Sequence, residues 1–167
     1  MKALITALML SALLALAGCG DDSSDEASQT TEASGAAEAS GDANDRTKPK
    51  VTVPDGAAPK QLVERDLIEG TGAEAKSGDE VTVQYVGVGF DSGEEFDASW
   101  DRGEPLTFQL GAGQVIKGWD EGVEGMKVGG RRQLTIPPDL AYGESGSPPT
   151  IGPNETLIFV VDLVATK

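Results

Sequence analysis

Apolar and polar residues alternate along several short segments in the second half of the chain. Glu80–Phe90 and Leu106–Leu110 place apolar side chains at every second position, which is typical of β-strands with one buried face. Arg131–Ile136 is a third segment of this kind. Thr156–Val164 is apolar at both alternating sets of positions, and a strand that is buried on both faces lies in the middle of a sheet. The pattern therefore predicts an antiparallel sheet with a central C-terminal strand.

One segment follows the helical period instead. Glycines interrupt it, so its helix propensity is low, and we expect a short helix that is held by packing. One short helix with about five strands predicts an α+β fold, in which the antiparallel sheet wraps around the helix. Its apolar residues recur at spacings of three and four: Val115, Ile116, Trp119, Val123 and Met126.

The N-terminus has the layout of a secretory signal. Lys2 precedes an apolar run from Ala3 to Ala17, which is shorter than the roughly 20 residues that a membrane span needs. The run ends in Leu16-Ala17-Gly18-Cys19 and resembles the lipobox of bacterial lipoproteins, in which the cysteine is lipidated and becomes the first mature residue. We expect residues 1–18 to be a lipoprotein signal peptide and Cys19 to be lipidated. An ordinary signal peptide or an uncleaved anchor is the alternative.

Residues 19–58 have the composition of a linker. Ser, Ala, Thr, Gly, Asp and Glu predominate, and every charged residue from Asp21 to Asp45 is acidic. Such a segment buries too little apolar surface to offset its ordering entropy, so we expect a disordered linker, with an acidic interaction tail as the alternative. Residues 59–167 then form one folded domain. A lipid at Cys19 would tether this domain to the cell membrane, outside the cytoplasm.

Composition excludes several kinds of chemistry. The chain of 167 residues contains no His and one Cys, so His-dependent triads, His-ligated zinc and an intrachain disulfide are excluded. A net charge of −15 argues against binding to nucleic acid. Gly113 and Gly118 have the spacing of a phosphate-binding loop, but Trp119 and Asp120 stand where Lys and Ser or Thr are needed. The acidic run 91–104 lacks the alternating ligand pattern of a calcium loop and reads as a solvated turn. We expect neither a metal nor a cofactor.

The aromatic residues indicate a binding site. Phe108 is explained by an ordinary core, but a buried Tyr or Trp also needs a partner for its polar group. An aromatic-lined concavity with a few hydroxyls would fit a compact apolar ring. Most of the aromatic residues fall where the strands, the helix and the following loop converge: Tyr85, Phe96, Phe108, Trp119, Tyr142 and Phe159.

The order of the short motifs resembles the FKBP-type peptidyl-prolyl cis-trans isomerase family over about Val63 to Thr166. Each motif alone is weak, whereas all of them in this order are specific. They are Val83-Gln84-Tyr85-Val86-Gly87; Phe96-Asp97-Ala98-Ser99 with Arg102 and Pro105; Phe108-Gln109-Leu110-Gly111; Gln114-Val115-Ile116-Lys117-Gly118-Trp119-Asp120-Glu121-Gly122; Met126-Lys127-Val128-Gly129-Gly130; Leu134-Thr135-Ile136-Pro137-Pro138; Ala141-Tyr142-Gly143; and Leu157-Ile158-Phe159.

The resemblance implies a pocket between a curved sheet and the helix. Trp119 would form its floor, and the backbone N–H of Ile116 would meet a ligand carbonyl. Asp97, Tyr142, Trp119 and Phe96 would be the catalytic residues, although Asp97 could instead be a turn residue that binds Tyr85 or Arg102. The residues expected to bind substrate are Tyr85, Phe96, Asp97, Leu106, Gln114, Val115, Ile116, Trp119, Tyr142 and Phe159.

The implied activity is rotation about X–Pro bonds, which requires no nucleophile, metal or proton transfer. The partners would be proline-containing polypeptides, with macrolides as possible inhibitors, and the expected state is a monomer. Leu106, Ser147 and Thr150 depart from residues that are frequent in the family, which leaves substrate preference open. The same pocket without turnover would make a proline-binding chaperone or adhesion module, and a solute-binding or structural lipoprotein is the more distant alternative.

Overall fold

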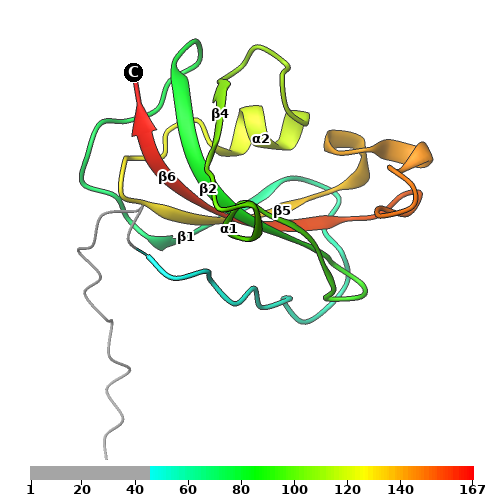
Figure 1. Ribbon diagram of the computed structural model, residues 1–167. Helices are drawn as coiled ribbons and strands as arrows, with labels where there is room; N and C mark the ends of the chain where they lie inside the picture. The colour runs from blue at the N-terminus through cyan, green and yellow to red at the C-terminus, as the bar shows by residue number, and fades with distance from the viewer. Residues whose placement is uncertain (1–45) are drawn as a thin grey trace, which may run out of the picture. The chain divides into compact units, whose positions relative to one another are not determined.

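A computed structural model of the chain describes residues 46–167, and the predicted signal peptide, Cys19 and residues 20–45 of the predicted linker lie outside this range. Six antiparallel strands form one sheet in the order β1-β5-β6-β2-β3, with β4 also paired to β2 (Figure 1). The elements are β1 Val63–Ile68, β2 Glu80–Gly89, β3 Glu95–Ala98, α1 Ser99–Arg102, β4 Leu106–Gln109, α2 Lys117–Gly122, β5 Arg131–Ile136 and β6 Leu157–Thr166, with 3-10 turns at Pro138–Leu140 and Gly143–Ser145.

The α+β class is confirmed, and the strands that alternation predicted are present within two residues of their expected ends. Strand β6 lies between β5 and β2, as its two apolar faces indicated. The sheet has six strands rather than about five, and α1 is a second short helix. Alternation did not predict strand β1, because it is an edge strand whose first five residues are all exposed. Within residues 46–167, no helix is long and apolar enough to cross a membrane.

Helix α2 is shorter than the segment over which apolar residues recur at helical spacing, Val115 to Met126. Its glycines face the sheet. A Cβ atom on Gly122 would lie 2.7 Å from the side chain of Leu134, and one on Gly118 would overlap Ile136. The two glycines therefore let the helix lie directly on β5, at the cost of helix propensity. Val123 and Met126 remain buried, but in the turn that follows the helix.

The sheet separates two apolar clusters. The larger one fills the concave side beneath α2 and includes Trp119, Leu134 and Leu163 (Figure 1). The smaller one lies on the opposite, convex side and consists of Val86, Val88, Phe90, Ala98 and Ile158. Strand β6 contributes alternate residues to both, which is why it is apolar at every position.

Residues 46–54, which we call the N-terminal arm, differ from the expected linker. They lie along the convex side of the sheet, where Val51 and Val53 pack against the smaller cluster (Figure 1). Three basic residues and two alternating valines distinguish this segment from the acidic stretch before it. The arm overlaps the end of the linker expected up to Ala58, and its apolar surface and charges pair with the domain.

A buried ion cluster holds the start of the arm. The Asp162 side chain is fully buried on the convex side and accepts hydrogen bonds from Nε and Nη2 of Arg131, at 2.7 and 2.6 Å. Nη1 of Arg46 lies 3.4 Å from the same carboxylate, and its Nη2 donates to the Gly129 carbonyl at 2.7 Å. Two guanidinium groups therefore compensate one carboxylate that water does not reach.

Candidate active site

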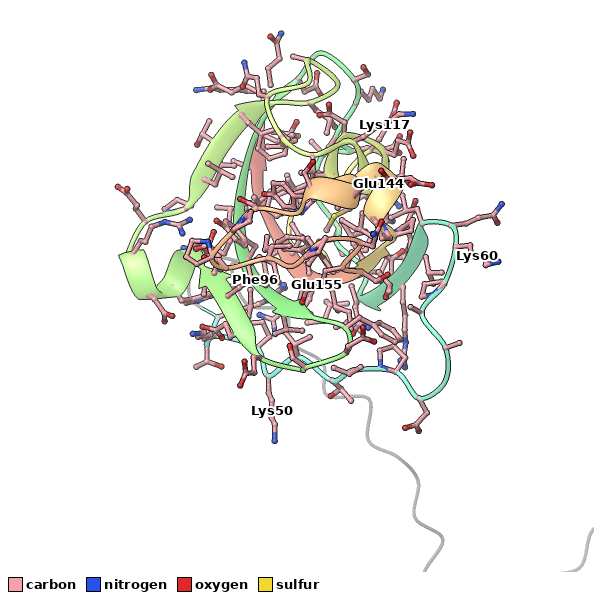
Figure 2. The ribbon with its side chains drawn as sticks, turned by 90° about the vertical axis from the view of Figure 1, so that its right-hand side faces the viewer. Lys50, Lys60, Phe96, Lys117, Glu144 and Glu155 are labelled. Atoms are coloured by element: carbon pink, nitrogen blue, oxygen red, sulfur yellow. The ribbon has the colours of Figure 1, made fainter. Side chains whose placement is uncertain are left out.

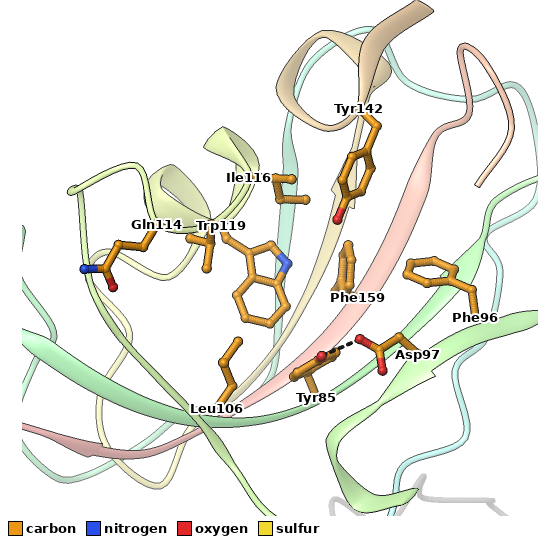
Figure 3. A pocket seen from close by; sticks show the side chains of 10 residues that line it. Tyr85, Phe96, Asp97, Leu106, Gln114, Ile116, Trp119, Tyr142 and Phe159 are labelled. Carbon is orange, nitrogen blue, oxygen red and sulfur yellow. Dashed lines mark hydrogen bonds between the residues drawn. The ribbon is translucent and has the colours of Figure 1, made fainter. Parts of the chain in front are cut away.

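A cavity of about 190 Å³ lies between α2 and the concave side of the sheet (Figure 3). This is below the roughly 300–1,000 Å³ of pockets for drug-sized ligands, so it suits one ring rather than a large cofactor. The structure brings together all ten residues that were expected to bind substrate. They are Tyr85, Phe96, Asp97, Leu106, Gln114, Val115, Ile116, Trp119, Tyr142 and Phe159.

Four aromatic rings form the floor and walls, and each packs edge-on against a neighbour. The Trp119 ring centroid lies 4.9 Å from that of Tyr85 and 5.2 Å from that of Phe159, with interplanar angles of 83° and 90°. Phe96 meets Phe159 in the same way at 5.5 Å and 88°. T-shaped contacts of this kind fix ring orientation beyond what area burial alone achieves. These contacts therefore preform the shape of the cavity.

Gly87 on β2 makes room for two of these rings. A Cβ atom there would lie 2.7 Å from ring atoms of both Phe96 and Phe159, so any larger residue would displace them. Gly87 is paired with Phe159 on β6 and with Asp97 on β3. The glycine thus lets both rings approach the backbone of β2 at the point where three strands meet.

Asp97, Tyr85 and Arg102 form a polar triangle at one side of the cavity. The Tyr85 hydroxyl donates to Asp97 Oδ2 at 2.5 Å (Figure 3). Arg102 Nη2 donates to the same hydroxyl at 2.7 Å, and Arg102 Nη1 pairs with Asp97 Oδ1. The Arg102 guanidinium also lies 5.3 Å from the centroid of the Tyr85 ring. Burial, and then the hydrogen bond to Asp97, raises the pKa of Tyr85 above its usual value of 10, so the phenol keeps its proton at neutral pH.

Asp97 therefore satisfies both descriptions that the sequence allowed. It makes the contacts to Tyr85 and Arg102 that a structural turn residue would make, and its carboxylate also lines the cavity. It lies in β3 rather than in a solvated turn. The geometry places a negative charge at the wall of the pocket, held in position by two donors.

The hydrogen-bond donors around the cavity include three of particular interest that have no partner among residues 46–167. The indole Nε1 of Trp119 is buried and unpaired. The backbone N–H of Ile116, directly before α2, and the hydroxyl of the exposed Tyr142 also make no hydrogen bond within the described domain. The buried Trp119 Nε1 costs about 1–3 kcal/mol while it has no acceptor, and the two more accessible donors lie beside it, so the pocket is suited to a ligand that supplies carbonyl oxygens.

The glycine-rich loop before α2 is already occupied by protein. The Asp120 carboxylate accepts the backbone N–H groups of Gly111 and Gly113 at 2.8 and 3.0 Å. These amides are therefore unavailable to a phosphate. Gln114 Oε1 accepts the N–H of Gln109 at 3.0 Å, so this side chain braces the loop.

Of the three residues that depart from the family pattern, only Leu106 lines the cavity. Ser147 is paired with Ile151 in the loop after Tyr142. Thr150 lines a separate hollow beside Phe96 and Glu155. Any effect of Ser147 or Thr150 on substrate preference must therefore act outside the main pocket.

Sequence reasoning gave no role to Ser99 and named Arg102 only as a possible partner of Asp97, yet both residues hold the pocket. The Ser99 hydroxyl accepts the backbone N–H of Tyr85 at 2.8 Å and also contacts Gln84, while Arg102 completes the triangle with Asp97. Both belong to the motif that begins at Phe96, so they were visible in the sequence as parts of a pattern. Only the fold shows that they face Tyr85.

The fold and the cavity define a class of proteins that hold a compact ring between a curved antiparallel sheet and one short helix. The model of the FKBP-type peptidyl-prolyl cis-trans isomerase family matches residues 72–164. The chain belongs to this family of enzymes, which confirms the resemblance seen in its motifs.

Similar proteins match about two thirds of this chain. An FK506-binding protein of Streptomyces anulatus is 62% identical over 119 residues, which are 71% of this chain and 96% of that protein. The crystal structure of AtFKBP13 is 40% identical with a TM-score of 0.60, over 66% of this chain and 96% of that one. The crystal structure of FkpA from Escherichia coli is 47% identical with a TM-score of 0.58, and the match covers 64% of this chain and 48% of that one.

Proposed function

We propose that this chain accelerates rotation about X–Pro bonds in exported polypeptides, from a lipid anchor at Cys19 on the outer side of the cell membrane. The observation that carries the catalytic part is the cavity itself. It has room for one ring, its walls are edge-packed aromatic rings, and unpaired N–H and O–H donors surround it.

The proposed mechanism needs only differential binding. Twisting a peptide bond costs amide resonance, and the rotational barrier is about 18–20 kcal/mol. Uncatalysed cis–trans exchange of an X–Pro bond is therefore slow. In the twisted state the amide is less dipolar, so a dry aromatic pocket favours it over the planar state. Trp119, Phe96 and Phe159 would hold the prolyl ring. The N–H of Ile116 and the hydroxyl of Tyr142 would bind the flanking carbonyls.

Asp97 would orient the twisted amide through its charge at the pocket wall. Asp97→Asn keeps the shape but removes the charge that faces Arg102 and Tyr85. We expect kcat/KM to fall about tenfold, since interactions with charged groups contribute about 1.5–3 kcal/mol. Exchange of short X–Pro peptides, followed by NMR line shapes, measures this. Asp91→Asn removes an exposed charge from the preceding turn and serves as the control. Full activity in Asp97→Asn would leave Asp97 as a structural residue only.

The wild-type chain in the same assay tests the function as a whole. We expect the full-length chain, held in mild detergent, to accelerate exchange of X–Pro peptides. A folded chain that binds these peptides without accelerating their exchange would sink the enzymatic proposal. It would leave a proline-binding module. The macrolide FK506, which gives the relatives their name, would occupy the same cavity and compete with the peptides. Leu106 would alter its fit.

The anchor and the location rest on the sequence. The lipobox-like Leu16-Ala17-Gly18-Cys19 supports lipidation, and Cys19 is the only cysteine of the chain. Cells that express the chain with labelled palmitate should incorporate the label, and Cys19→Ser should abolish incorporation and release the protein from the membrane fraction. Equal membrane retention of Cys19→Ser would contradict the proposed anchor. Slow prolyl steps limit the folding of many chains, so a surface-held isomerase would act on exported ones.

A further inference from the structure

The one-turn helix α1 lies between the N-terminal arm and the pocket. Two of its four residues, Ser99 and Arg102, contact the pocket strand β2. The other two, Trp100 and Asp101, contact the arm. Each residue of this helix is therefore engaged on one side or the other.

The contacts on the pocket side fix the polar triangle. Ser99 binds the Tyr85 backbone, and Arg102 binds both the Tyr85 hydroxyl and Asp97. Arg102 is exposed and reaches the pocket from the surface, so its position depends on where α1 is held. A shift of α1 would move Arg102 and release Asp97.

The contacts on the arm side centre on Lys48. Its Nζ donates to Asp101 Oδ1 and Oδ2 at 2.8 and 3.0 Å and to Glu95 Oε1 at 2.7 Å. The hydrogen bond to Asp101, followed by that to Glu95, raises the pKa of Lys48, which keeps the ammonium charged. Beside it, Trp100 packs with the arm against the smaller apolar cluster. Lys48 thus links Glu95 in β3, which precedes Asp97 in the sequence, to Asp101 in α1, which follows it.

As a single turn, helix α1 depends on tertiary contacts to hold this position. A single turn fixes several dihedral angles for one hydrogen bond, so helix nucleation is unfavourable. Its N-cap, Ala98, has no side-chain capping hydrogen bond. An exposed ion pair adds little global stability, so the effect of Lys48 should be on local geometry rather than on unfolding.

We propose that Lys48 is a positioning residue of the isomerase pocket, which holds β3 and α1 from the convex side so that Asp97 and Arg102 meet Tyr85. This inference rests on the proposed function, because its main readout is turnover. It adds to the pocket a residue that lies before the family-matched segment, on the opposite side of the sheet from the substrate.

Three variants of the full-length chain in mild detergent test it. In Lys48→Gln we expect kcat/KM to fall about threefold to tenfold, which corresponds to roughly 0.7–1.4 kcal/mol of transition-state stabilisation. Lys48→Arg should retain most of the activity, since a guanidinium can still donate to both carboxylates. Lys50→Gln is the matched control, because Lys50 is two residues away and points into solvent (Figure 2). Melting temperatures of all three should agree within a few degrees.

A double-variant cycle with Asp97→Asn separates positioning from general weakening. If Lys48 acts through Asp97, Lys48→Gln should have little further effect in the Asp97→Asn background. The same fold-loss in both backgrounds, or no loss in Lys48→Gln alone, would overturn the proposal.

An inactive wild-type chain would instead refute the proposed function and leave Lys48 to be judged by the NMR signals of the Tyr85 ring. These signals should shift in Lys48→Gln and stay in place in Lys50→Gln. Unshifted signals in Lys48→Gln would overturn the proposal on their own.

Discussion

Trp119→Leu should leave a folded chain that has lost its isomerase activity. The indole is 3% exposed, forms the floor of the cavity and contacts Tyr85 and Phe159 edge-on. Leucine removes the floor and the unpaired Nε1 donor together. We expect kcat/KM to fall about a hundredfold, equivalent to roughly 2.7 kcal/mol of transition-state stabilisation. Peptide exchange rates measure the loss, and chemical denaturation measures the accompanying change in stability, which we expect to be about 2–4 kcal/mol.

Phe108→Leu is the control for this loss. Phe108 is 4% exposed and lies 5.8 Å from Trp119 between ring centroids, but it does not line the cavity. It should lower stability by about 1–3 kcal/mol while retaining most of the activity. If both variants lose activity in proportion to their loss of stability, the cavity floor has no specific role in turnover.

Arg131→Met should be the most destabilising single substitution among the ion pairs of residues 46–167. It leaves the fully buried Asp162 with Arg46 as its remaining cation, at 3.4 Å. Removing one partner of a buried pair typically costs about 3–5 kcal/mol, because the other charge stays buried without compensation. Denaturant midpoints at neutral pH measure this, and Asp162→Asn in the same chain should recover part of the loss by removing the charge.

Lys167→Met provides the contrast. Its Nζ lies 2.8 Å from Glu80, close to the Arg131–Asp162 distance of 2.6 Å, but both side chains are exposed. We expect little measurable loss, as for other surface pairs. Equal losses in the two variants would show that burial does not set the strength of the Asp162 cluster.

The central strands and the residues that line the pocket could both be predicted from the sequence, for different reasons. Alternation predicted β2, β5 and β6 because successive side chains of a strand point to opposite faces of the sheet, and at least one face of each strand is buried. Alternation could not choose which aromatic residues meet around one cavity. That set came from the order of the family motifs, and the structure places all ten members together. The catalytic roles of these residues stay predictions.

The features that were missed depend on contacts between distant parts of the chain. The arm docks because Arg46 meets Asp162, 116 residues later, and because Lys48 meets Glu95 and Asp101. No local period encodes such partners, and the arm itself has no secondary structure. Strand β3 is hidden for a related reason, because its four residues include two acids and only pairing with β2 makes them a strand.

The docked arm decides from which direction the domain can be attached. Arg46 is bound on the convex side, whereas the cavity opens on the concave side beneath α2. Any partner joined ahead of Arg46, such as an affinity handle or a solid support, is therefore linked to the back of the enzyme. A bulky unfolded client could approach the opening without meeting that junction, so immobilisation through the N-terminus should leave access to the active site intact.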